Sequence, residues 1–240
     1  MFLEDFVGSA ELLAWAKDNG CPWESRTCDE AAKGGHLQAL RWAREHGCPW
    51  GATTCARAAE GGHLESLKWA REHGCPCDWR TCACAAGGGH LEVLQRARAH
   101  DCPCDSMLLD VCEFAAQRGQ LGVLRWAFEH GGAELNEWTC AMAAKGGQLE
   151  VLRWAREQGC PWSARTCQQA ASSGHLEVLQ WAREHGCEWD EFTCEGAAVG
   201  GHLAVLQWAV EHDAPWVASD CALVADAYGH MEVAQCCLHV

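Results

Sequence analysis

The chain of 240 residues carries 18 lysines and arginines against 33 aspartates and glutamates, a formal net charge of −15. A surface of that sign repels phosphate backbones, so the composition excludes a general nucleic-acid binder. No apolar run reaches the roughly 20 residues that a membrane helix needs, and the acidic start MFLEDF lacks the features of a signal or transit peptide. We therefore expect a protein of the cytosol, or of the nucleus, without membrane association.

An internal repeat organises the sequence. The segment TCDEAAKGGHLQALRWAREHGCPW begins at Thr27 and returns as TCARAAEGGHLESLKWAREHGCPC at Thr54, a period of 27 residues. A histidine or glutamine in the middle of each unit marks eight repeats: His36, His63, His90, Gln120, Gln148, His175, His202 and His230. We predict a single continuous array, with an N-terminal capping half-repeat at residues 1–26, repeats over 27–219 and a C-terminal capping repeat at 220–240.

The first half of each unit predicts a short helix. Thr27 stands where an N-cap belongs, and Glu30 three residues later would complete a capping box. An alanine pair, Ala31 and Ala32, allows close packing of one helix on another. The glycines at 34 and 35 suit a left-handed end to the helix.

The second half predicts another helix. In HLQALRWAREHG, Leu37, Leu40 and Ala43 share one apolar stripe, and Gly47 followed by Pro49 ends the helix. No alternating strand pattern occurs anywhere in the sequence. The fold class predicted is all-α, an α-solenoid of stacked helix-turn-helix units that bury one another's apolar faces.

The repeated string T-C-x-x-A-A-x-x-G-H-L-E-x-L-x-W-A-x-E-H-G-C, complete from Thr166 to Cys187, resembles the ankyrin repeat. Three features depart from that family: the first helix is one residue shorter, the usual hairpin finger is shortened to GCPWxxxT, and Cys28 stands where the family has proline. The resemblance implies ankyrin-like repeats without β-hairpin fingers, in a protein that binds other proteins and has neither catalytic residues nor a cofactor.

Tryptophan and histidine recur at fixed positions of the unit. One tryptophan column lies in the second helices and another in the loops, and we interpret both as packing between repeats. An aromatic ladder for a ligand is the alternative, and it would require exposed rings. We interpret the histidines that follow Gly-Gly, such as His36, as braces of the turn through side-chain hydrogen bonds to the backbone.

The 19 cysteines are interpreted as reduced, buried thiols, because nothing in the sequence indicates secretion. Pairs seven residues apart straddle the loops: Cys48 and Cys55, Cys160 and Cys167, Cys187 and Cys194. One denser group consists of Cys75, Cys77, Cys82, Cys84, Cys102 and Cys104. Four thiolates of this group could bind zinc, although the usual C-x2-4-C pairs are missing. We predict no metal site and leave that alternative open.

Positions that differ between the repeats are the candidates for recognition, since the framework itself is copied. Large apolar or arginine side chains at such positions of the first helices and loops are the predicted partner-binding residues: Trp79, Arg80, Phe114, Trp138, Met142, Arg165 and Phe192. Met107 and Leu108 join them from an irregular stretch, residues 101–139, which either contributes to binding or has drifted.

The sequence therefore predicts a non-catalytic scaffold or adaptor for protein partners, a monomer when free, for which a basic partner surface would suit the charge of −15. An integral structural subunit of a larger assembly is the alternative. No catalytic motif of hydrolases, nucleotide-binding enzymes or zinc proteases occurs, so we expect that the protein is not an enzyme.

Overall fold

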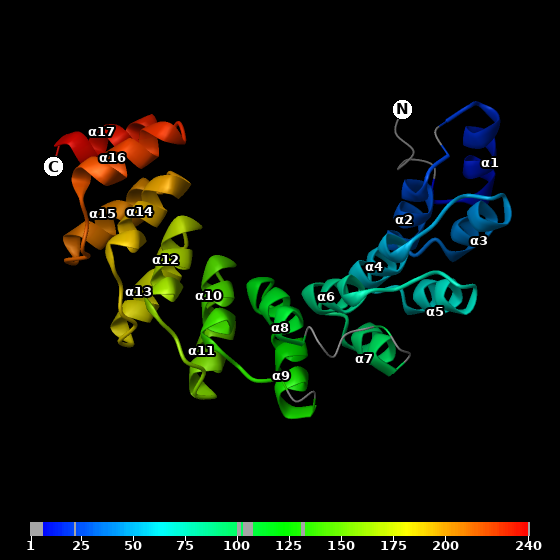
Figure 1. The fold of residues 1–240 in the computed structure, drawn as a ribbon, viewed down its shortest axis with the longest axis horizontal. Coiled ribbons are helices and arrows are strands. Elements are labelled where there is room, and N and C mark those ends of the chain that lie inside the picture. The colour runs from blue at the N-terminus through cyan, green and yellow to red at the C-terminus, as the bar shows by residue number, and fades with distance from the viewer. Residues whose placement is uncertain (1–6, 22, 100–101, 103–107, 131–132, 240) are drawn as a thin grey trace. The chain divides into compact units, whose positions relative to one another are not determined.

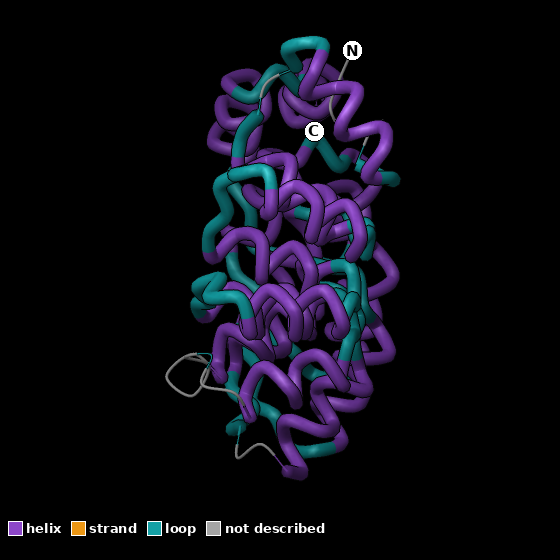
Figure 2. Tube along the Cα trace, turned by 90° about the vertical axis from the view of Figure 1, so that its right-hand side faces the viewer, coloured by secondary structure: helices purple, strands orange, loops and turns teal. Residues whose placement is uncertain are grey.

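The computed structural model describes residues 7–21, 23–99, 102, 108–130 and 133–239, without the side chains of residues 108–110 and 239. Helices and connecting loops make up this part of the chain, and it contains no strand (Figures 1 and 2). The predicted all-α fold class is thereby confirmed.

Each repeat contributes one helix from its first half and one from its second half. The first helices are α2 (Ser25–Lys33), α4 (Ala52–Glu60), α6 (Trp79–Gly87), α8 (Leu108–Gln117), α10 (Glu137–Lys145), α12 (Ala164–Ser172), α14 (Glu191–Gly200) and α16 (Ala218–Ala227). The second helices are α3 (Leu37–Glu45), α5 (Leu64–Glu72), α7 (Leu91–Ala99), α9 (Leu121–His130), α11 (Leu149–Glu157), α13 (Leu176–Glu184), α15 (Leu203–Glu211) and α17 (Met231–His239). Helix α1 (Ala10–Asp18) supplies the N-terminal half-repeat.

The first helices begin before the repeated threonine, so the assignment of Thr27 as an N-cap was wrong. Helix α2 begins at Ser25, and Thr27 is its third residue and buried. In two repeats the hydroxyl at this position reaches back to the cap: the Thr54 Oγ1 accepts from the Gly51 N–H at 3.3 Å, and the Thr139 Oγ1 from the Asn136 N–H at 3.4 Å. Asn136 is the true N-cap of α10, and its Oδ1 accepts from the backbone N–H groups of two residues in the first turn.

The Gly-Gly turn and the following histidine form a joint between neighbouring repeats. Gly62 adopts a left-handed conformation, with φ of +76°, directly after the cap of α4. A Cβ at Gly62 would lie 2.5 Å from Nδ1 of His90, a histidine of the next repeat. The His90 Nε2 lies 3.0 Å from the carbonyl oxygen of Glu60 and donates to it. His90, His175 and His230 therefore brace a turn through a hydrogen bond to the backbone, as expected, but the turn belongs to the preceding repeat.

Leucines and alanines of both helices form the core. The second helices from α3 to α15 bury one leucine each in the same register, and α17 has Ala234 there. The exposed fraction of Leu40, Leu152 and Leu179 is 0%. The alanine pairs of the first helices are equally buried, which lets α2, α4 and α6 pack side by side in one part of the molecule and α10, α12 and α14 in another. Helix α16 packs on α14 with Val224 and Ala225 in place of the pair.

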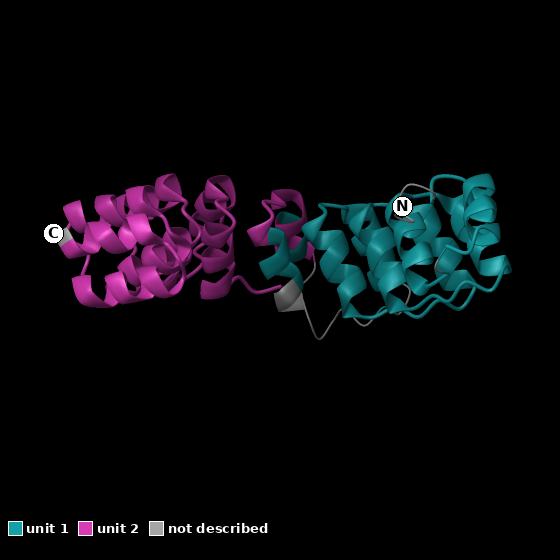
Figure 3. Cartoon of the chain, turned by 90° about the horizontal axis from the view of Figure 1, so that it is seen from above, with its two compact units in different colours: residues 1–115, 125–127 teal, residues 116–124, 128–240 magenta. Residues whose placement is uncertain are grey.

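The chain divides into two compact units (Figure 3). Unit 1 comprises residues 1–115 and 125–127, and unit 2 comprises residues 116–124 and 128–240. The surfaces described below lie within one unit each.

Candidate partner-binding surface

The first helices of unit 2 present several predicted partner-binding residues on one face. Trp138 and Met142 lie four residues apart on α10, so they share a side of that helix. Arg165 precedes the buried threonine of α12 by one residue, and Phe192 does the same in α14. Because α10, α12 and α14 pack side by side, these residues fall on neighbouring helices in the same register. We call these four residues the first-helix face.

One contact joins two members of this face. The guanidinium of Arg165 lies 4.3 Å from the centre of the Trp138 ring, a cation–π contact between successive repeats. Trp138 and Met142 are half-buried, whereas Arg165 is exposed and Phe192 has an exposed fraction of 49%. The fold thus leaves aromatic surface accessible here and fixes part of it with an arginine from the next helix.

The two predicted residues of α6 lie in unit 1. Trp79 is half-buried at the first position of the helix. The Arg80 guanidinium is exposed and donates to its own N-cap, with Nε and Nη2 at 2.9 and 2.7 Å from the Asp78 carboxylate. Arg80 therefore has an intramolecular partner and is a weaker candidate for an anchor than the sequence suggested.

Three further predicted residues belong to the irregular stretch. Phe114 lies on α8 with an exposed fraction of 39%. Leu108 is the first residue of α8, and its side chain is outside the description; Met107 lies outside the described residues altogether. The structure thus leaves Met107 and Leu108 as predictions.

The second-helix side carries an arrangement that the sequence reasoning missed. Four of the loop tryptophans each contact a tryptophan of a second helix that lies nineteen residues further along the chain. Ring centres are 5.6 to 6.0 Å apart in the edge-on pairs Trp23–Trp42, Trp50–Trp69, Trp162–Trp181 and Trp189–Trp208. The interpretation as packing between repeats is confirmed for these pairs. Because any two columns of a repeat keep a constant offset, the spacing alone does not indicate that these two columns meet.

The cysteines that straddle the loops are buried thiols, as expected, but their contacts are with cysteines other than the one seven residues away. The thiol of Cys28 lies in hydrogen-bond contact with Cys48, and Cys140 with Cys160, twenty residues apart instead of seven. The hydrogen bond with Cys48 and burial both raise the pKa of Cys28 above its ordinary value. Burial is the main cause that raises the pKa of Cys194 to about 12, so such thiols stay protonated. The second helix of a repeat folds back on the first helix. The cysteine that follows the second helix, such as Cys48, therefore meets the cysteine inside the first helix, such as Cys28.

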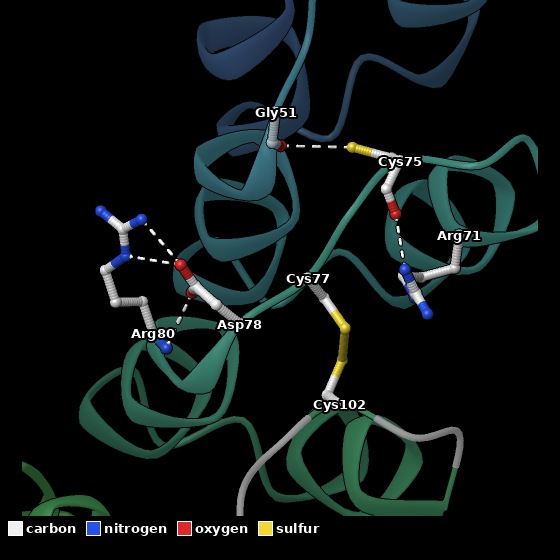
Figure 4. Close-up of a disulfide and its surroundings, with 7 residues drawn as sticks. All are labelled: Gly51, Arg71, Cys75, Cys77, Asp78, Arg80 and Cys102. Carbon is white, nitrogen blue, oxygen red and sulfur yellow. Dashed lines mark hydrogen bonds and ion pairs between the residues drawn. A yellow bond between two sulfur atoms is a disulfide. The ribbon is translucent and has the colours of Figure 1, made fainter.

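The dense cysteine group contains a disulfide between Cys77 and Cys102, whose Cα atoms are 5.8 Å apart (Figure 4). This pair corrects the expectation that the thiols are reduced throughout, although core cysteines such as Cys28 and Cys140 remain thiols. Cys104 lies outside the described residues. In the part of the chain that is described, no three cysteine, histidine or acidic side chains gather as metal ligands would.

The geometry defines the class of protein, an array of helix-turn-helix repeats that presents varied side chains from a copied framework. No model of a protein family matches the sequence, and no curated protein matches it. Among solved structures, the crystal structure of the human ASB11 ankyrin repeat domain is similar, with a TM-score of 0.50 and 15% identity. The match covers 67% of this chain and 84% of that domain. The chain therefore has the ankyrin-repeat fold.

Within the described residues, no helix is both long enough and apolar enough to span a bilayer.

Proposed function

We propose that the protein is a non-catalytic scaffold that holds a protein partner on the first-helix face. The observation that supports this function best is the exposed aromatic surface of unit 2, where Phe192 is 49% exposed and Arg165 covers Trp138. Tryptophan, phenylalanine, methionine and arginine dominate the energetics of protein interfaces. The residues of the first-helix face occupy positions at which the residue type differs from one repeat to the next.

The charge of the molecule supports a partner with a basic surface. A net charge of −15 attracts such a partner over distances of about a Debye length and accelerates its association. We therefore propose binding that weakens as the salt concentration rises.

Site-specific crosslinking tests the surface. A photoreactive phenylalanine at position 192 samples the first-helix face, and the same group at Ala204, exposed on α15 of the same repeat, is the matched control. We expect the partner to crosslink at position 192 and not at position 204. A Trp138→Ala change should reduce its binding at least about tenfold, as for an interface anchor.

Equal crosslinking from both positions would contradict this surface. The alternative function, a structural subunit, makes a different prediction: the chain would be recovered from its source inside a stable assembly of constant composition that resists high salt.

A further inference from the structure

A cavity of about 270 Å³ lies on the second-helix side of unit 1, between α5 and α7. It is lined by Leu67, Lys68, Arg71, Glu72, Arg96, Ala97 and Cys102. Three of these side chains are cations and one is a carboxylate, so the local charge is opposite in sign to the −15 of the whole chain. We call this cavity the α5–α7 pocket.

The pocket lies where two tryptophans are missing from the repeat. The register that pairs Trp50 with Trp69 pairs Cys77 with Arg96 in the next repeat. Neither replacement has the bulk of an indole, and Cys77 is tied to Cys102. The space reaches inward to Leu67 and Ala97 as a consequence, which gives the pocket an apolar floor.

An arginine is already positioned over the missing ring. In the regular repeats this arginine covers the loop tryptophan, with its guanidinium 4.7, 4.2 and 4.1 Å from the ring centre in the pairs Arg44–Trp50, Arg156–Trp162 and Arg183–Trp189. Arg71 occupies the same register. Its Nη1 donates to the carbonyl oxygen of Cys75 at 2.6 Å (Figure 4). The Nη1 of Arg44 donates in the same way to the carbonyl oxygen of Cys48 at 3.2 Å. The cation is therefore held as it is elsewhere, but Cys77 stands in place of the indole beneath it.

We propose that the α5–α7 pocket binds an aromatic group that carries one negative charge. The ring rests on Leu67 and Ala97 and receives Arg71 on its face, as the indoles of the other repeats receive their arginines. The acid group pairs with Arg96 and Lys68. Lys68 already has one exposed partner, Glu65 at 2.7 Å, and its ammonium has three donors. The carboxylate of Glu72 disfavours a ligand with a larger negative charge.

The probe is indole-3-propionate, added to the full chain and followed by calorimetry, with its neutral amide as the matched compound. We expect a Kd on the order of 1 mM, which is ordinary for a fragment of this size. The amide should bind about fivefold more weakly, because it loses the ion pair. Absence of binding by the acid up to about 10 mM, where a ligand of that affinity would nearly saturate the site, would overturn the proposal.

Two substitutions at one position separate the ring from the charge. Arg96→Trp restores the residue that the second helices carry elsewhere, so we expect the chain to fold, the space to be filled and binding to be lost. Arg96→Gln leaves the space open. It should weaken the binding of indole-3-propionate about fivefold without changing the binding of the amide. The control is Arg153→Gln on α11, an arginine of a regular repeat. Unchanged binding by the Arg96→Trp chain, with its unfolding temperature preserved, would place the ligand elsewhere and overturn the site.

The ring and acid could belong to a small molecule or to a protein. The blocked dipeptide N-acetyl-Asp-Trp-amide carries the same chemistry on a peptide. Tighter binding of the dipeptide than of indole-3-propionate assigns the pocket to a partner's side chains, and the reverse order assigns it to a small aromatic acid. Failure of both compounds to bind would refute the pocket without affecting the first-helix face.

Discussion

Asp29 is a carboxylate on α2 that the packing of the first helices leaves only 9% exposed. The Thr54 Oγ1 donates to its Oδ1 at 2.6 Å, which favours the ionised form, but burial dominates and raises the pKa of Asp29 above its ordinary value. A carboxyl whose pKa is raised on folding contributes stability below its unfolded pKa. That contribution is lost as the pH rises through the folded pKa.

We predict that Asp29→Asn raises the free energy of unfolding at neutral pH. The carboxamide keeps an oxygen that accepts from Thr54 and removes the cost of a buried charge. Urea unfolding of both chains measures the effect. The advantage of the variant should shrink as the pH falls through the folded pKa of Asp29, because the native carboxyl is then neutral too. A variant that is less stable at neutral pH would show that the charge itself is used, for instance by the neighbouring Arg57.

At the scale of the elements, the burial of a side chain determines how much its substitution changes the stability of the repeat array. Leu152 on α11 is fully buried, whereas Gln168 on α12 of the next repeat is only half-buried. Leu152→Ala should lower the free energy of unfolding by about 2–5 kcal/mol, since it leaves a cavity between layers. Gln168→Ala should change it by no more than about 0.5 kcal/mol. Denaturant midpoints that coincide for the two variants would refute this assignment of the core.

The helix pairs and their period were predictable from the sequence because they rest on local patterns. The start of the first helices was not. The true N-caps occupy one position of the repeat but share no side-chain type, as Glu24, Gly51 and Asp78 show. The repeated threonine is a typical N-cap residue, and it therefore indicated a helix start at the wrong position. The partner of Cys140 and the pocket beside Arg96 depend on how one helix folds back on another, and spacing along the chain does not encode that.

At the scale of the whole molecule, the repeat makes the chain divisible. We predict that a chain lacking residues 148–174, one complete period, still folds cooperatively. His202 then meets Gly147, the position that His175 occupies now, and Cys140 meets Cys187 in place of Cys160. The slope of the unfolding free energy against urea should fall by roughly a tenth, in proportion to the surface lost.

The control for that deletion is a chain lacking residues 148–160, about half a period. This deletion removes the second helix α11 and joins the first helix α10 directly to a loop. The repeat then lacks the helix that packs on α10, and the units on either side no longer follow in register. Cooperative unfolding of this second chain, with a slope like that of the first, would show that the register of the repeat is unimportant.

The histidine–glycine joint also determines how such a chain can lengthen. Each unit offers a glycine turn and a carbonyl to the unit after it and a histidine to the unit before it, as Gly147, Lys145 and His175 show. The two halves of the joint are the same in the regular repeats, so a gene segment copied in whole periods inserts a unit that fits both neighbours at once. Recombination between the copies can therefore vary the length and the exposed residues of the protein while the joint between neighbouring units is preserved.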